Sequence, residues 1–200
     1  HIATPKEIKK EKIRALTKTQ LNDLLGKIKN RKFYIASLLA ATCGLRLGEI
    51  LGLTWNDIDF INSTLTVNKQ WKRLKNNKWG FGVVKSSNSN RTVPIPPKTL
   101  GELGRYKKEA VTDINNRIIL YTAKTNFSSE IVLAYKKIGY DISIHDLRHT
   151  YATMLIGNGV DFKTAAKLLG HDVKETMNTY SHVTDDMLYR ATSAVNNIFK

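Results

Sequence analysis

Apolar residues recur at helical spacing through most of the chain, and these runs predict its main elements. Thr17 and Gln20 form a capping box ahead of an amphipathic helix over residues 21–28. Residues 33–43 (FYIASLLAATC) are apolar nearly all round, which predicts a buried helix ended by Gly44. The same spacing, with polar caps and glycine stops, predicts further helices over residues 100–108, 129–137, 143–157, 161–170, 173–179 and 185–199.

Stretches with strand character are few and short. They cover residues 58–60, 65–71, 81–84 and 92–95, with a turn at Asn62 and Ser63 between the first two. The last two strands flank a polar run, which predicts a hairpin with Lys85 at or near its tip. The expected fold class is α+β: a mostly helical domain with a small antiparallel β-sheet.

Length and composition fit one well-cored domain, since the chain has 200 residues and is 42% hydrophobic. We expect residues 15–200 to form this domain and the lysine-containing residues 1–14 to be a linker or arm. No run approaches the roughly 18 apolar residues of a membrane span, and no signal peptide is visible. The single cysteine, Cys43, can form no internal disulfide, so we expect it in the core of a cytoplasmic protein.

The chain is strongly basic. It has 32 Lys and Arg against 17 Asp and Glu, a formal net charge of +15. Such an excess attracts a polyanion over long range and makes its binding sensitive to salt. Charge alone does not separate DNA from RNA or from an acidic membrane.

Candidate chemistry is concentrated late in the sequence, where His145, Arg148, His171 and Tyr180 follow one another. His145 and Arg148 are three residues apart, so both project from the first turn of one predicted helix, whose N-terminus favours anions. Arg46 lies earlier between apolar residues, where burial is costly unless it pairs with an anion. Imidazoles, guanidinium groups and a phenol in a basic protein indicate a site for a phosphate.

Five short motifs carry a family resemblance: TCGLRLGE (42–49), VKS (84–86), IHDLRHT (144–150), LLGH (168–171) and TYSH (179–182). In this order, and across most of the chain, they resemble the tyrosine recombinases, most of all the phage and conjugative-transposon integrases. No catalytic position departs from the family pattern. The resemblance implies that the catalytic residues are Arg46, Lys85, His145, Arg148, His171 and the nucleophile Tyr180. Such integrases also carry an N-terminal core-binding domain, so we expect this chain to be a catalytic-domain fragment.

Roles follow from the resemblance together with the chemistry of each group. Tyr180 attacks the scissile phosphorus, giving a 3′-phosphotyrosyl link and a free 5′ hydroxyl; a phenol with a pKa near about 10 needs a proton acceptor, for which His145 is the candidate. Arg46 and Arg148 hold the non-bridging oxygens, and His171 donates a further hydrogen bond. Lys85 protonates the leaving oxygen. No metal, ATP or other cofactor is expected.

The implied partner is double-stranded DNA at a specific attachment site, for integration or excision of a mobile element. Candidates for contacts to the DNA backbone are Lys69, Lys72, Arg73 and Arg91. The predicted C-terminal helix, 185–199, has one apolar side. It packs either on its own domain or on a neighbouring subunit, as in a synaptic tetramer on DNA.

Three alternatives remain open at this point. A type IB topoisomerase shares the chemistry but relaxes supercoils without exchanging partners, and a non-catalytic DNA-binding relative would keep the fold alone. His145 and His149, four residues apart, are also spaced to share zinc, although Asp146 stands where a zinc protease has glutamate. We otherwise expect His149 and His182 to be structural.

Overall fold

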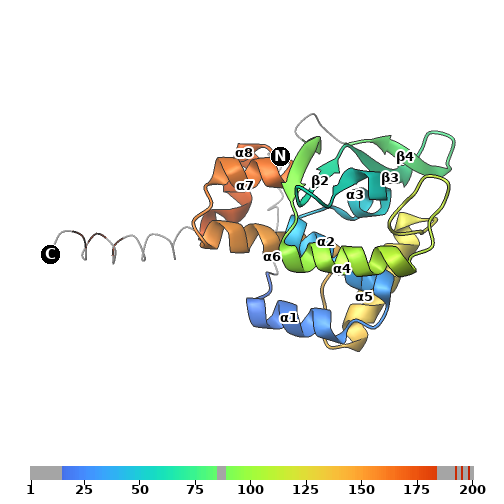
Figure 1. The fold of residues 1–200 in the computed structure, drawn as a ribbon. Coiled ribbons are helices and arrows are strands. Elements are labelled where there is room, and N and C mark those ends of the chain that lie inside the picture. The colour runs from blue at the N-terminus through green and yellow to red at the C-terminus, as the bar shows by residue number, and fades with distance from the viewer. Residues whose placement is uncertain (1–14, 85–88, 184–191, 193–194, 196–197, 199–200) are drawn as a thin grey trace, which may run out of the picture.

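A buried helix runs through the centre of the molecule in the computed structural model, which describes residues 15–84, 89–183, 192, 195 and 198. This is α2 (Arg31–Cys43), and α6 (Ile144–Gly157) packs against it (Figure 1). Helix α1 (Lys18–Lys27) lies across one end of α2. Its predicted capping box is confirmed, because the Thr17 hydroxyl accepts from the Gln20 backbone at 3.2 Å and the Gln20 side chain accepts from the Thr17 backbone at 2.9 Å.

The other helices surround this pair. They are α3 (Leu47–Gly52), α4 (Pro97–Glu109), α5 (Lys124–Lys137), α7 (Phe162–Leu169) and α8 (Val173–Tyr180), with 3-10 turns η1 (Trp55–Asp57) and η3 (Ser181–Val183). The helices predicted within the described ranges are confirmed. Helix α4 begins three residues before its predicted start because Pro97 occupies the first helical position, where its fixed φ suits the helix. Of the predicted helix 185–199, the structure describes only residues 192, 195 and 198.

The strands form two small antiparallel sheets. One has the order β1 (Ile58–Asp59), β2 (Thr64–Val67), β5 (Arg91–Pro94). The other pairs β3 (Lys69–Arg73) with β4 (Trp79–Val83), with Trp71 opposite Phe81. The predicted fold class, mostly helical α+β with a small antiparallel sheet, is confirmed.

Two strand predictions were wrong. The predicted strand 65–71 is divided at Asn68 between the two sheets. The predicted hairpin between 81–84 and 92–95 does not form, because β4 pairs with β3 and β5 pairs with β2. Lys85 therefore follows a strand of one sheet on the way to the other, and it lies outside the described residues.

Two glycines permit close approaches that hold the site together. Gly44 ends α2 with φ of +66°, and a Cβ there would lie 2.5 Å from the Tyr151 ring. A Cβ on Gly52 would lie 2.8 Å from the Gln70 backbone, where α3 crosses β3. Any larger residue would push these elements apart.

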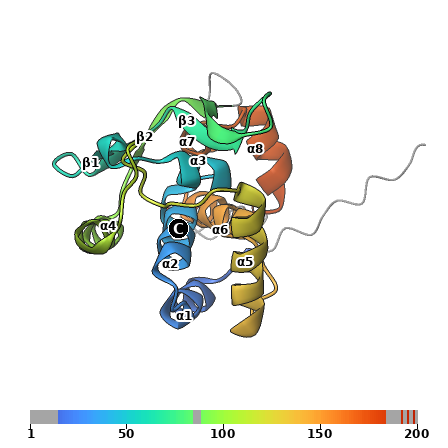
Figure 2. The ribbon, with the colours of Figure 1, turned by 90° about the vertical axis from the view of Figure 1, so that its right-hand side faces the viewer.

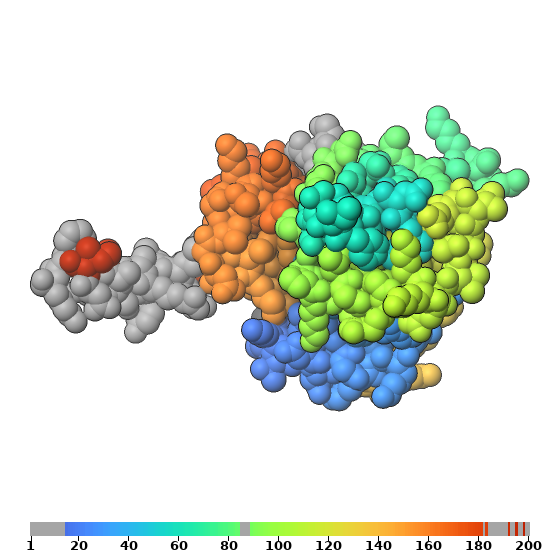
Figure 3. Space-filling model, in the orientation of Figure 1, coloured from blue at the N-terminus to red at the C-terminus, as the bar shows by residue number. Residues whose placement is uncertain are grey.

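The core has two parts. The larger is built around α2 and includes the sheets and α5 (Figure 2), and Cys43 is buried in it as predicted. The smaller lies between α6, α7 and α8 and contains Tyr151, Leu169 and Tyr180. In the space-filling view, these three helices form a distinct block at one end of the molecule (Figure 3). Within the described ranges, no helix has the length and apolar character that crossing a membrane requires.

Candidate active site

Arg46 begins the site at the turn between α2 and α3. Its backbone N–H donates to Glu49 Oε2 at 2.9 Å, and its Nη1 donates to Glu49 Oε1 at 2.9 Å. Its Nη2 reaches across the molecule to the Gly170 carbonyl, at 3.2 Å. The side chain is 32% exposed, so it remains accessible to a ligand.

Glu49 is a buried carboxylate that three arginines share. Besides Arg46, it accepts from Arg91 Nη2 at 2.9 Å and lies 3.9 Å from Arg148 Nη1. Burial acts to raise the pKa of Glu49, but the arginines outweigh it and hold that pKa below its usual value. The carboxylate therefore stays charged and fixes the positions of the guanidinium groups around it.

Arg148 is the most enclosed cation of this group. From α6 it donates to the Gly44 carbonyl at 2.5 Å and to the Leu169 carbonyl at 2.6 Å, so it joins the ends of α2 and α7. Burial and the neighbouring Arg46 lower its pKa to about 9, against the opposing effect of Glu49, which leaves it charged at neutral pH. Its Nε is buried and has no hydrogen-bond partner among the described residues.

His171 follows Gly170, which ends α7 in the left-handed conformation with φ of +65°. Its Nε2 lies 2.8 Å from Arg148 Nη2. Since a guanidinium can only donate, Nε2 accepts and the proton resides on Nδ1. Burial and the nearby arginines lower the pKa of His171 to about 3, so the ring is neutral.

Tyr180 is the last residue of α8 and has no exposed surface. Its hydroxyl lies 2.5 Å from His149 Nδ1. Burial raises the pKa of Tyr180 to about 12, although Arg148 acts in the opposite direction. In this state the nucleophile candidate is a neutral phenol held by a neighbouring imidazole.

His145 lies at the start of α6 and is exposed. Its ring meets the His149 ring edge to face, with centroids 4.3 Å apart. With Arg46, Lys124 and Ser128, it lines a small cleft of about 270 Å³. The cleft offers an anion one guanidinium, one ammonium and the N-terminus of α6.

The structure thus brings five of the six predicted site residues into two groups, which meet at the neighbouring residues Arg148 and His149 of α6. Arg46 and Arg148 share Glu49, Arg148 contacts His171, and the His145–His149 pair leads to Tyr180. The sixth, Lys85, lies outside the described residues. Arg46 is distant in sequence from the other four, which lie between residues 145 and 180, and all five meet where α2, α6, α7 and α8 converge.

A family model described as the phage integrase family matches residues 14–187. The chain belongs to this family. A tyrosine recombinase XerC-like protein of Caldanaerobacter subterraneus is 30% identical, over 98% of this chain and 57% of its own length. The ICEBs1 integrase of Bacillus subtilis is 32% identical, over 76% of this chain and 45% of its own length. The chain therefore spans about half the length of these curated relatives.

A solved structure of the Tn1549 transposon integrase, in complex with transposon right end DNA, has the same fold. The TM-score is 0.78 at 24% identity, covering 94% of this chain and 68% of that one. The fold of this phage integrase family member is thus the one that a transposon integrase uses.

His149 contacts two of the predicted site residues. We expected it to be structural, yet its ring contacts both His145 and the Tyr180 hydroxyl. The sequence feature that indicated the contact with His145 was the spacing of the two histidines, because residues four apart lie on the same face of a helix. Among the described residues, no group of three or more His, Cys, Asp or Glu side chains could hold a metal ion.

Arg91 corrects a second prediction. Its side chain is 3% exposed and donates to Glu49 and to the Leu168 and Ser89 carbonyls, so it is an interior ion-pair partner and not the surface cation that a DNA contact requires. Lys69 pairs with Asp57 at 2.5 Å, and Lys72 donates to the Val83 carbonyl at 3.2 Å. Arg73, at the end of β3, is exposed. These three remain predictions as DNA contacts.

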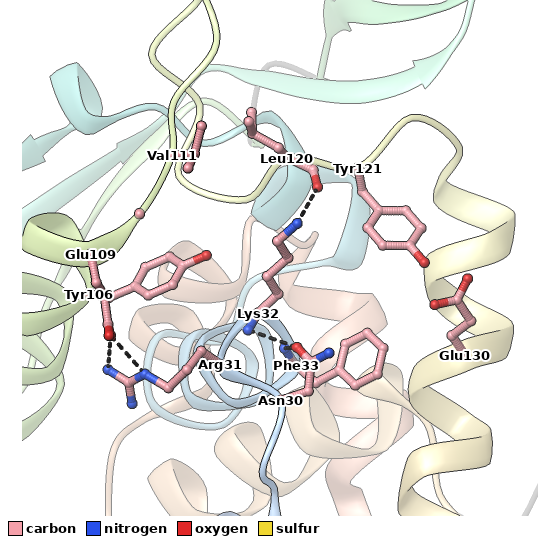
Figure 4. A pocket seen from close by; sticks show the side chains of 11 residues that line it. Asn30, Arg31, Lys32, Phe33, Tyr106, Glu109, Val111, Leu120, Tyr121 and Glu130 are labelled. Carbon is pink, nitrogen blue, oxygen red and sulfur yellow. Dashed lines mark hydrogen bonds and ion pairs between the residues drawn. The ribbon is translucent and has the colours of Figure 1, made fainter.

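A pocket of about 490 Å³ lies elsewhere, between the start of α2, the end of α4 and α5 (Figure 4). Its charged groups are already engaged: Arg31 pairs with Glu109 at 2.8 Å, and Lys32 donates to the Leu120 carbonyl at 3.3 Å. Glu130 faces Tyr121 and, with burial, raises the pKa of that phenol to about 12. None of the five predicted site residues that the structure describes lines this pocket.

Proposed function

We propose that this chain is the catalytic domain of a site-specific DNA recombinase, which cleaves and rejoins DNA through a 3′-phosphotyrosyl intermediate during integration or excision of a mobile element. One observation carries the proposal. Arg46 and Arg148, far apart in sequence, are fixed side by side on Glu49, next to His171 and near the Tyr180 phenol.

The geometry suits a phosphodiester. Arg46 and Arg148 can donate to the two non-bridging oxygens and neutralise the charge that develops as the phosphorus gains a fifth oxygen. The buried Nε of Arg148 has no partner among the described residues and supplies one such donor. Tyr180 attacks, the 5′ oxygen leaves, and Lys85 protonates it. The phosphotyrosyl bond keeps the energy of the diester, so rejoining needs no nucleotide.

DNA must also change the resting site. His171 Nε2 accepts from Arg148 here, so this nitrogen can donate to a phosphate only after that contact is exchanged and the ring proton moves to it. The Tyr180 side chain has no exposed surface, so α8 must shift to let the phosphorus approach. A ligand that stabilises the shifted state more than the resting state produces this change.

Duplex DNA is the proposed partner, and the host cytoplasm the proposed location. Self-association on DNA is proposed to use the segment 185–199, of which Val195 and Ile198 are described and exposed. Their apolar side chains suit a protein contact, as in a synaptic tetramer.

The decisive experiment traps the covalent intermediate. Nicked suicide duplexes are selected from a random-sequence pool by covalent capture on the wild-type protein, and mass spectrometry then locates the linkage. We expect a 3′-phosphotyrosyl bond at Tyr180 and none with Tyr180→Phe. A two-site recombination assay beside a supercoil-relaxation assay separates recombinase from topoisomerase. Specific DNA binding without any adduct would overturn the proposal.

A further inference from the structure

The Tyr180 hydroxyl has an imidazole partner that the predicted roles leave out. His149 Nδ1 lies 2.5 Å from it, a short distance for a hydrogen bond, and the two rings are 5.7 Å apart between centroids. Both rings are enclosed by α6 and α8, and Tyr180 packs in the smaller core cluster. The hydrogen bond thus fixes the direction in which the phenolic oxygen points.

The electrostatic surroundings favour His149 as the acceptor in this bond. Burial and then His145 lower the pKa of His149 to about 4; Arg148 adds to this, and Asp146 opposes it. His145, Asp146 and Arg148 all lie on α6 with His149. The residue of α8 that faces the His149 ring is Tyr180. The ring is therefore neutral at physiological pH, and its Nδ1 lone pair can accept the phenolic proton.

We propose that His149 positions the Tyr180 hydroxyl and accepts its proton during attack on the scissile phosphate. This inference rests on the proposed function. It assigns the nucleophile's proton to His149 in place of His145, which the sequence had suggested. The His145 ring packs edge to face against the His149 ring.

The step balances. The bond from Tyr180 Oη to phosphorus forms while the bond from phosphorus to O5′ breaks; the phenolic proton moves to His149 Nδ1, and a proton from Lys85 goes to O5′. The phenolic oxygen becomes much more acidic as it bonds to phosphorus, so even a weak base receives its proton late in the attack. On rejoining, the 5′ hydroxyl attacks, and His149 returns the proton to the departing Tyr180 oxygen.

The first test uses the full chain without DNA. Nitrogen-15 NMR of the histidine rings should show His149 protonated at Nε2 and accepting at Nδ1. With 3-fluorotyrosine placed at position 180, His149→Leu should shift the fluorine resonance. His149→Asn should shift it less, because the asparagine oxygen takes the place of Nδ1. Ser37→Ala, which removes a similar buried bond to the Tyr135 hydroxyl at 2.6 Å, should leave that resonance unchanged.

The second test measures adduct formation on the captured suicide duplex. We expect His149→Leu to slow the step by about 10²-fold or more, the usual contribution of a general base, and His149→Asn to slow it less. Ser37→Ala should form adduct at the wild-type rate. A duplex with sulfur in place of the bridging 5′ oxygen needs no proton on its leaving group. It should therefore restore Lys85→Ala but not His149→Leu.

The outcomes separate the two proposals. Wild-type rates in folded His149→Leu and His149→Asn, with Tyr180→Phe inactive, would overturn the role of His149 and leave the recombinase proposal standing. Restoration of His149→Leu by the sulfur substrate would also overturn it, because the defect would lie on the leaving-group side. No adduct with the wild type would overturn the proposed function and this role with it, while the NMR result would still report on the resting hydrogen bond.

Discussion

At the scale of single residues, the buried carboxylate of Glu49 organises the candidate site. The sequence shows Glu49 three residues after Arg46, a spacing that favours the ion pair seen in the structure. It did not predict that Arg91 and Arg148 share the same carboxylate, since those contacts cross long stretches of chain. The spacing of residues along a helix predicts which side chains contact each other within that helix. A contact with a residue of another element can be identified only from the folded structure.

Replacing this carboxylate should be costly. In Glu49→Gln, three guanidinium groups lose their counter-charge, and breaking buried ion pairs in this way typically costs about 3–5 kcal/mol. We expect the free energy of unfolding in urea to fall by that order and adduct formation to fall with it. The matched control is Glu109→Gln, whose carboxylate pairs with Arg31 but is 53% exposed and should cost under about 1 kcal/mol. Equal losses in the two variants would contradict the role given to Glu49.

The two buried imidazoles should make stability depend on pH. The folded pKa values of His149 and His171, about 4 and about 3, lie below their ordinary value of 6.5. The unfolded state therefore binds more protons, so this contribution is complete above pH 6.5 and is lost as pH falls toward 4 and 3. Urea denaturation from pH 7 to 4 should show the decline, and His171→Asn should make it shallower. An unchanged slope would show that His171 is not buried as a neutral ring.

At the scale of elements, the ends of the helices position the residues of the candidate site. The Gly44 and Gly170 stops, and the caps of α1, α6 and α7, follow from residue types alone and were predicted. The pairing of the strands was not predicted, because an alternation of β-branched and polar residues indicates a strand but does not identify the strand with which it pairs. The sequence from Leu65 to Trp71 has no break in its strand pattern, yet its first part belongs to β2 in one sheet and its last part to β3 in the other.

Gly44→Ala tests the turn that presents Arg46. A Cβ here meets the Tyr151 ring at 2.5 Å and a left-handed backbone, which costs about 1–2 kcal/mol before any steric clash. We expect lower thermal stability and slower adduct formation. Gly26→Ala is the control: it lies within α1, with nothing within 4 Å of its added Cβ, and should stabilise by up to about 1 kcal/mol. A neutral Gly44→Ala would contradict the close approach.

At the scale of the whole molecule, the net charge of +15 should govern DNA affinity. Fluorescence anisotropy should show the logarithm of the binding constant falling linearly with the logarithm of salt concentration. Lys72→Ala, on β3, should reduce that slope by about one if it contacts a phosphate. Lys27→Ala, on α1 at the opposite end from the strands (Figure 1), should not. Equal slopes for Lys72→Ala and the wild type would remove Lys72 from the contact surface.

The main-chain carbonyls that receive the two site arginines have a consequence for synthesis. Arg148 donates to Gly44 and Leu169, and Arg46 donates to Gly170. A ribosome must therefore release everything through Gly170 before either guanidinium is locked in place, and the phenol emerges later still. A growing polypeptide that ends before Gly170 therefore lacks these contacts, and under the proposed function it cannot yet hold a phosphate between the two guanidinium groups.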